Sequence, residues 1–209
     1  MRQRNLLRWR VSFLFTAGLF AGCNAGPTAV SIPSYDPAES SAEAVRLFDS
    51  NQNGSIEGGE LAACPSLQAA LPMIDRDGNG NLTAAEIEAR LQQYGGQQIG
   101  LMPLQCTISR GGQPVANAHV QFVPEAFLKH AIQPASGKTD SQGVAWMKVA
   151  GSDTRAMQLG LYRVEITAPN DSGQETIPSQ FNAQTTLGAE VATDNPNVES
   201  GLTFDLSSK

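Results

Sequence analysis

The chain has 209 residues, of which 14 are basic and 20 are acidic, and its formal net charge is −6. All four ionisable side chains in residues 1–22 are arginines, so the rest of the chain holds 10 basic against 20 acidic residues and is near −10. This balance argues against a nucleic-acid partner, because nucleic-acid binding needs a cluster of basic side chains and none follows Arg10.

The N-terminus has the three parts of a secretory signal peptide. Residues 1–10 are basic, residues 11–21 are mainly apolar, and small residues precede Cys23. The apolar stretch is too short to cross a hydrocarbon core, which needs roughly twenty residues. Residues 19–23 resemble a bacterial lipobox, although Phe20 stands where that motif usually has leucine.

We therefore expect residues 1–22 to be removed and Cys23 to be acylated and inserted into a lipid bilayer. This predicts an exported, membrane-anchored lipoprotein that faces the periplasm or the cell surface. The alternative is an ordinary signal peptide followed by an incidental cysteine. Residues 23–37 are rich in proline and poor in apolar residues, which predicts a tether between the anchor and the folded part.

Two segments match the EF-hand calcium loop, which places oxygen ligands at positions 1, 3, 5, 7, 9 and 12 and a glycine at position 6. In residues 49–60 the predicted ligands are Asp49, Asn51, Asn53, the Ser55 carbonyl, Glu57 and Glu60. In residues 75–86 they are Asp75, Asp77, Asn79, the Asn81 carbonyl, Thr83 and Glu86. Gly54 and Gly80 occupy the turn position, and both loops are complete.

The ligand pattern indicates Ca²⁺, which takes six to eight oxygens including a bidentate carboxylate at position 12. Smaller, octahedral Mg²⁺ uses that carboxylate pair poorly. A lone match could be an Asx-rich turn, but two complete loops in tandem favour calcium. Since each loop offers three carboxylates, we expect weak sites, with dissociation constants on the order of 10⁻⁵ to 10⁻³ M.

The residues around the loops predict short helices. Residues 40–43 resemble a capping box that opens a helix before the first loop. The stretch between the loops leaves room for about one turn of helix after Glu60, with Pro65 near the start of the next helix. Ile87, Leu91 and Tyr94 recur with helical spacing after the second loop. Residues 38–96 are thus expected to form a small EF-hand pair.

From residue 100 onward, short apolar runs alternate with turn residues about every ten positions, which is typical of a β-sandwich. The expected strands are 104–109, 119–123, 143–149, 161–167 and 202–206. Strict alternation predicts that Tyr162, Val164 and Ile166 face the core. Cys64 and Cys106 either form a disulfide between the two halves, in an oxidising compartment, or stay as buried, unreactive thiols.

Four segments carry a resemblance to a known domain: residues 112–125, 135–143, 160–166 and 177–182. They look like the carboxypeptidase regulatory-like, or transthyretin-like (prealbumin-like), domain of exported bacterial proteins. With the paired loops and the lipobox, the whole chain resembles a group of uncharacterised bacterial lipoproteins. The resemblance implies a multidomain α plus β chain in which an antiparallel β-sandwich of about seven strands, over residues 100–209, follows the EF-hand pair.

These features predict a non-enzymatic calcium-binding protein. Calcium would order the helical module, and the sandwich would present a surface to an envelope protein or glycan. The alternative is a structural subunit of a cell-envelope assembly, joined by edge-strand pairing. His119 and His130 lie in no catalytic motif, and Asp140 is expected to stabilise a hairpin turn. Trp146 is expected in the core rather than in a ligand patch.

Overall fold

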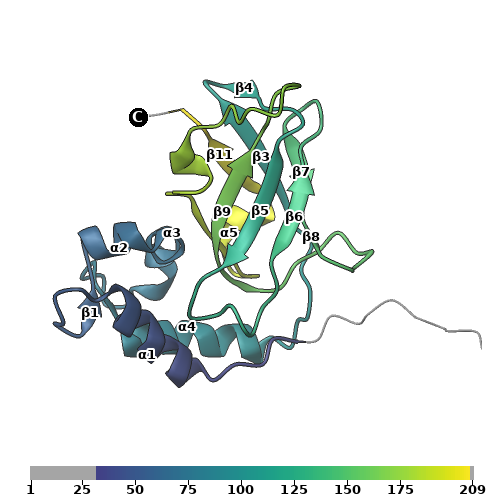
Figure 1. Cartoon of the computed structure of the whole chain (residues 1–209). Helices are drawn as coiled ribbons and strands as arrows, with labels where there is room; N and C mark the ends of the chain where they lie inside the picture. Colours follow the sequence, from purple (N-terminus) through teal and green to yellow (C-terminus); the bar gives the residue numbers. More distant parts are fainter. Residues whose placement is uncertain (1–31, 208–209) are drawn as a thin grey trace, which may run out of the picture.

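In the computed structural model, the described residues are 32–207. The predicted signal peptide 1–22, the predicted acylation site Cys23 and most of the predicted tether 23–37 lie outside the described residues. The first part of the described chain is mainly helical and the second part consists mainly of strands (Figure 1). Within residues 32–207, no helix is long and apolar enough to cross a bilayer.

The first part contains α1 (Pro37–Phe48), α2 (Gly59–Ala63), α3 (Pro65–Ile74) and α4 (Ala84–Gly96). Asp36 caps α1, because its side chain accepts hydrogen bonds from the backbone N–H groups of Ala38 and Glu39. The helix therefore begins before the predicted capping box, and Ser40 is buried inside it. The short α2 and the position of Pro65 at the start of α3 agree with the prediction.

Two short strands join the loops that follow α1 and α3. β1 (Ser55–Ile56) and β2 (Leu82–Thr83) run antiparallel, with Ile56 opposite Leu82. Both of these side chains are 0% exposed. The two loops therefore form one unit, because each supplies half of a small sheet and part of the same buried contact.

The second part of the chain forms a five-stranded and a four-stranded sheet, which together we call the two-sheet region. In order, the first sheet contains β10 (Gly188–Val191), β9 (Gly160–Thr167), β5 (His119–Pro124), β6 (Ala135–Lys138) and β8 (Lys148–Val149). The second contains β11 (Leu202–Asp205), β3 (Gln105–Arg110) and β4 (Gln113–Pro114), with β7 (Val144–Trp146) also paired to β3. A short 3-10 helix, η1 (Ser179–Phe181), and a short helix, α5 (Pro196–Glu199), lie in the connections.

The two sheets share a core, which gives this region a sandwich-like arrangement (Figure 1). The ring of Phe122 on β5 meets those of Phe204 on β11 and Tyr162 on β9 edge to face, with centroids 6.3 Å and 6.0 Å away. Tyr162, Val164 and Ile166 are all buried, as their alternation predicted. Contacts between β5 and β11 therefore tie one sheet to the other.

The predicted antiparallel sandwich of about seven strands is wrong in two respects. The two sheets hold nine strands within the described residues, because β4, β6 and β10 pair in addition to the five expected strands and one expected strand is divided in two. β11 runs parallel to β3, with Leu202 opposite Cys106, so the four-stranded sheet is mixed. The strand predicted over 143–149 is divided into β7 and β8, which belong to different sheets on either side of the buried Met147.

The disulfide considered between Cys64 and Cys106 is not formed. Both cysteines are free and buried. Cys64 Sγ lies 3.7 Å from Ser66 Oγ at the start of α3, whereas Cys106 Sγ lies 3.8 Å from Met147 Sδ between the sheets. The two thiols thus have separate surroundings, and burial raises the pKa of Cys106 to about 12.

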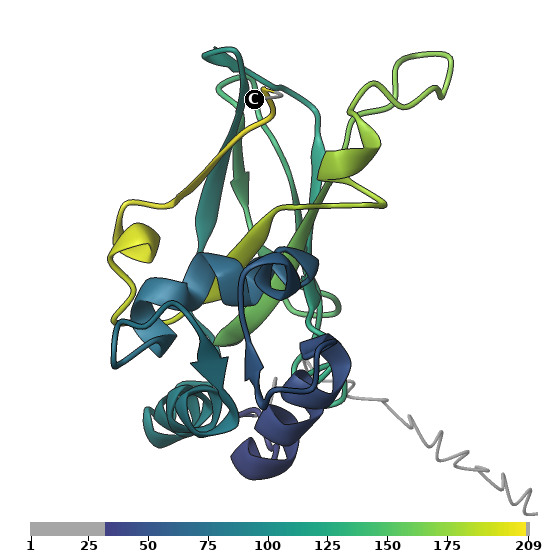
Figure 2. The ribbon, with the colours of Figure 1, turned by 90° about the vertical axis from the view of Figure 1, so that its left-hand side faces the viewer.

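The helical part packs against the five-stranded sheet, where α3 contacts β10 and β9 (Figures 1 and 2). Buried residues of the helices and of both sheets belong to one hydrophobic cluster. The approach is closest at Gly188 on β10, where a Cβ atom would lie 2.0 Å from the carbonyl carbon and oxygen of Pro65. Glycine is therefore required at Gly188 by the backbone of α3, and the two parts share a core.

Candidate metal centre

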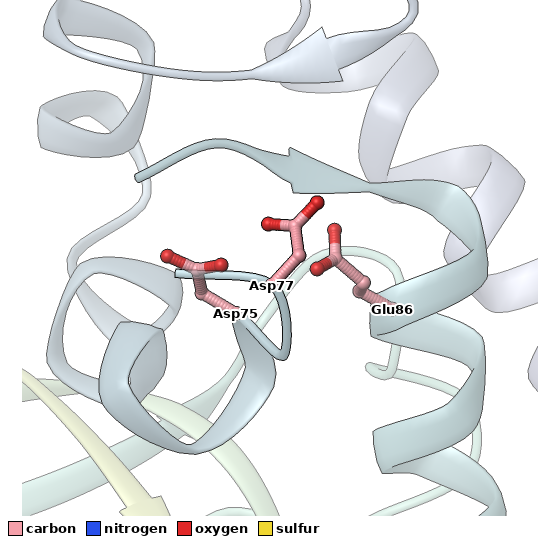
Figure 3. Close-up of side chains that lie close together, drawn as sticks. All are labelled: Asp75, Asp77 and Glu86. Carbon is pink, nitrogen blue, oxygen red and sulfur yellow. The ribbon is translucent and has the colours of Figure 1, made fainter. Parts of the chain in front are cut away.

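The second predicted loop, residues 75–86, brings three carboxylates together between α3 and α4 (Figure 3). One oxygen from each of Asp75, Asp77 and Glu86 lies within 4.8 Å of the other two. Asp75 directly follows α3, and its backbone N–H donates to the Leu71 carbonyl at 2.9 Å. Glu86 lies in the first turn of α4 and forms a capping box with Thr83. The orientation of the two helices thus sets the positions of the first and last carboxylates.

Hydrogen bonds from the loop favour the ionised form of two of these carboxylates. Asp75 Oδ2 accepts from Gly80 N and its Oδ1 from Gly78 N, each at 2.8 Å, and these bonds lower the pKa of Asp75. Burial by itself would raise the pKa of Glu86. Hydrogen bonds from the backbone N–H and the hydroxyl of Thr83 outweigh burial, so the pKa of Glu86 is also lowered.

The remaining predicted ligands of the second loop lie beside these carboxylates. Asn79 Nδ2 donates to Asp77 Oδ2 at 2.8 Å, and Asn79 Oδ1 accepts from the Asn81 N–H at 2.7 Å. Thr83 Oγ1 donates to Glu86 Oε2 at 2.8 Å. The oxygen-bearing side chains that the loop pattern selected are therefore gathered around one small region.

In the first predicted loop, residues 49–60, Glu57 is the centre of a hydrogen-bonded cluster. Its carboxylate accepts from Ser55 Oγ at 2.6 Å, from Asn51 Nδ2 at 3.0 Å and from the Asn53 side-chain amide. These bonds, led by the one from Ser55, lower the pKa of Glu57. The two amide groups therefore turn their N–H donors toward an acid of their own loop.

Asp49 and Glu60, at the two ends of the first loop, bind separate parts of the loop backbone. Asp49 Oδ2 accepts from Gly54 N at 2.8 Å. Glu60 Oε1 accepts from the hydroxyl and the backbone N–H of Ser50, both at 2.8 Å, and these bonds lower the pKa of Glu60. In the part of the chain that the structure describes, the second loop alone brings three carboxylates within 4.8 Å of one another.

The residue at position 4 of each twelve-residue loop is a further difference between the two loops. Gln52 in the first loop and Gly78 in the second both adopt left-handed backbone conformations, with φ of 59° and 72°. Glycine does so freely, whereas a residue with a Cβ atom is strained by about 1–2 kcal/mol. The first loop therefore adopts the same turn at a higher conformational cost.

In both loops the oxygen atoms that could bind a metal ion belong to exposed or half-buried residues. Carboxylate, amide and hydroxyl oxygens without nitrogen or sulfur partners suit a hard cation such as Ca²⁺. Negative charges on carboxylates held within 4.8 Å of one another repel, and a divalent cation would relieve that repulsion. The chemistry of the donor set and the geometry of the second loop therefore fit the predicted ion.

No family model and no curated protein matches this chain. A solved structure that matches is the crystal structure of the major pilin subunit of Bacillus cereus, with 13% sequence identity and a TM-score of 0.29. The match covers 51% of this chain and 29% of the pilin chain, so this chain spans less than a third of that protein. Similarity this low carries no argument; the β-rich character follows from the strand pairing itself. Membership of the lipoprotein group stays a prediction.

The residues weighed for catalysis lie apart from the loops in the sequence. His119 on β5 and His130 after that strand both have exposed side chains. Asp140 stabilises the predicted turn, because its Oδ1 accepts from Gln142 N at 2.8 Å and from Val144 N at 3.0 Å. Asp140 is therefore engaged by the backbone of its own hairpin.

The expected core position of Trp146 is wrong. Its side chain is 43% exposed on β7, while its neighbours Ala145 and Met147 are fully buried. Side chains of a strand alternate between faces, so Trp146 must point outward if both neighbours point inward. The size of the indole suggested burial, but the register of β7 against β3 decides its direction.

A buried polar network that the sequence did not predict joins α4 to the five-stranded sheet. Arg90, 3% exposed, donates from Nε to Glu190 Oε1 at 2.5 Å and from its two Nη atoms to Asp194 at 2.7 Å and 2.9 Å. Tyr94 OH donates to Glu190 Oε1 at 2.5 Å, and Asn195 Nδ2 donates to Glu190 Oε2 at 3.0 Å. We call these five residues the docking network. The available sequence signal was an arginine on the apolar face of α4.

A second buried carboxylate lies near the start of α3. Glu125 is 2% exposed, and Arg163 Nε is 3.9 Å from its Oε2. Its Oε1 has no hydrogen-bond partner among residues 32–207. Burial raises the pKa of Glu125, while Ser66 on α3 and Arg163 act in the opposite direction. Both buried acids of the two-sheet region therefore face helices that flank the second loop.

Proposed function

We propose that the chain is a non-enzymatic calcium-binding protein whose residues 38–96 form a pair of EF-hands. The observation that carries the proposal is the convergence of Asp75, Asp77 and Glu86 between the end of α3 and the start of α4. The antiparallel contact between Ile56 and Leu82 supports it, because paired EF-hand loops need such a link. An Asx-rich turn requires neither a helix on each side nor a partner loop.

Calcium acts structurally in this proposal. Residues at the ends of α3 and α4 would hold the ion, so its binding would stabilise the folded helical part relative to the unfolded chain. At a calcium concentration of about 100 times the dissociation constant, this linkage adds about 2.7 kcal/mol to the free energy of unfolding. Affinities on the order of 10⁻⁵ to 10⁻³ M would suit extracellular calcium.

The same proposal includes export and attachment to a membrane through acylated Cys23. Its support is the basic, apolar and small-residue order of residues 1–23. The two-sheet region then presents a surface to an envelope protein or a glycan. Trp146 supports that role, because exposed aromatic side chains are frequent anchors in binding surfaces and this one is 43% exposed.

A calorimetric calcium titration of the full chain tests the proposal. We expect saturable binding of about two ions, lost in the Glu60→Gln, Glu86→Gln double variant, which removes both position-12 carboxylates. The control is Glu88→Gln, which removes an acid of α4 that contacts Gln92 instead of the loop. The control should bind as the parent does. Absence of saturable binding to the parent up to about 10 mM calcium would refute the proposal.

A further inference from the structure

The two loops are attached differently to the rest of the molecule. α3 and α4 flank the second loop, and each makes a specific contact with the two-sheet region. The first loop lies between α1, which packs against α4, and α2, which has five residues. A helix this short has little stability of its own. The second loop thus lies between two helices that contact the two-sheet region, whereas α2, after the first loop, packs against α1 and α3.

Charged contacts fix the orientation of α4. Arg90 lies four residues, or about one turn, after Glu86, so the two side chains emerge from the same side of the helix. The guanidinium of Arg90 meets Glu190 and Asp194 at the same time, and a planar group can satisfy both acids in few orientations. Rotation of α4 would break these bonds and move the carboxylate of Glu86.

Steric contact fixes the position of α3. Its first residue, Pro65, touches Gly188 so closely that a Cβ atom there would lie 2.0 Å from the Pro65 carbonyl. Its last turn leads directly into Asp75, so one helix of ten residues, about 15 Å long, connects the contact at Gly188 with the second loop. The placement of Asp75 therefore depends on the contact of α3 with β10.

We propose that Arg90 and Glu190 are positioning residues for the second loop, which therefore binds calcium first and with an affinity that depends on the two-sheet region. This inference rests on the proposed calcium-binding function. Neither residue is among the predicted ligands of the ion. They act by holding α4, and with it Glu86, at a fixed distance from Asp75. Coupling of this kind between two parts of a protein typically changes an affinity by about 5- to 150-fold.

Substitutions of Arg90 on α4 and of Glu190 on β10 distinguish the docking of α4 on the sheet from a local effect on the stability of α4. Arg90→Met leaves the Glu190 carboxylate buried without its cation, which drives α4 away from the sheet. The Arg90→Met, Glu190→Gln variant removes the unpaired charge, so α4 can return. Glu190 is 100 residues distant in sequence and belongs to the other part of the chain. Rescue by Glu190→Gln therefore reports on docking rather than on the local stability of α4.

The experiment is a calcium titration by calorimetry on full-length chains with one loop disabled. Glu60→Gln isolates the second loop, and Glu86→Gln isolates the first. With the second loop isolated, Arg90→Met should raise the calcium dissociation constant about tenfold, and added Glu190→Gln should recover most of that loss. With the first loop isolated, the calcium dissociation constants of the Arg90→Met chain and of the Arg90→Met, Glu190→Gln chain should both stay within about twofold of the value for Glu86→Gln alone. The matched control is Arg46→Met, which breaks an exposed ion pair with Glu43 on α1; it should change neither loop.

Gly188→Ala provides an independent test, because it displaces α3 without touching a charged group. It should also weaken the second loop more than the first. Equal effects on the two loops, an unchanged second loop, or no rescue by Glu190→Gln would overturn the inference while leaving calcium binding intact. No binding to the parent would instead refute the proposed function and, with it, this inference.

Discussion

Replacing Gly188 with alanine should separate α3 from β10 and destabilise the whole chain. The added Cβ atom would lie 2.0 Å from the carbonyl carbon and oxygen of Pro65 and 2.3 Å from the backbone nitrogen of Ser66. Ordinary contact begins at 3.4 Å, so the two backbones must move apart by about 1.4 Å. Backbone atoms cannot rotate aside as the tip of a flexible side chain can. The cost should therefore reach the upper end of the range for overpacked sites, about 3 kcal/mol.

Urea unfolding followed by circular dichroism measures this cost as a change in the free energy of unfolding. For a chain of this size, about 3 kcal/mol corresponds to a fall in Tm of roughly 6–12 °C. The control is Gly95→Ala at the end of α4, where a Cβ atom would meet nothing within 4 Å. That variant should be neutral or more stable by about 0.5–1 kcal/mol. A Gly188→Ala chain within about 0.5 kcal/mol of the parent would refute the close docking of the two parts.

Three further predictions follow from individual residues. Gln52→Gly should stabilise the first loop by about 0.5–1 kcal/mol, because the relief of backbone strain exceeds the conformational entropy that glycine loses on folding, and Gly78→Gln should destabilise the second loop. Thermal melts without calcium measure both effects. Tm values equal to that of the parent would contradict the strain. Burial raises the pKa of Glu125, so the parent loses stability as the pH rises above the pKa that this group has in the unfolded chain. In urea melts, the free energy of unfolding of Glu125→Gln should therefore increase relative to that of the parent from about pH 4 to pH 7. A constant difference over this range would argue against burial of the charge. A thiol reagent should label Cys64 and Cys106 after unfolding and not before, with no reductant needed; labelling that requires a reductant would indicate a disulfide.

Local patterns predicted the elements whose chemistry is contained within a few residues. The loop spacing correctly placed the short α2 and the start of α3 at Pro65. The alternation of residues 161–167 correctly selected the buried face of β9. These features depend on interactions between near neighbours or on a period of two or 3.6 residues, which the sequence displays directly.

Features that depend on distant pairing were missed or wrongly assigned. Periodicity shows which side of a strand is buried but not the direction of its partner, so the parallel pairing of β11 with β3 was not predicted. The same limit applies to Trp146, whose direction follows from the register of β7. Arg90 and Glu190 are 100 residues apart, and nothing local to either one identifies the other. In the first loop, the pattern selected Asn51 and Asn53 as ligands, but it could not show that their amide groups donate to Glu57.

The docking network is made of charged and polar groups, and this explains why the geometry of the proposed calcium site would depend on it. Replacing a buried ion pair with apolar residues is often neutral for stability, so the network is weak as an explanation of stability alone. The network does fix the orientation of α4 relative to the sheet. An apolar face on α4 could slide or rotate against the sheet with little loss, because apolar contacts are not directional. Arg90 and Tyr94 allow only the arrangement in which both reach the same Glu190 oxygen. A cation site must be held within about 0.5 Å, so transferring the second loop to another scaffold should require this arrangement as well as the ligands.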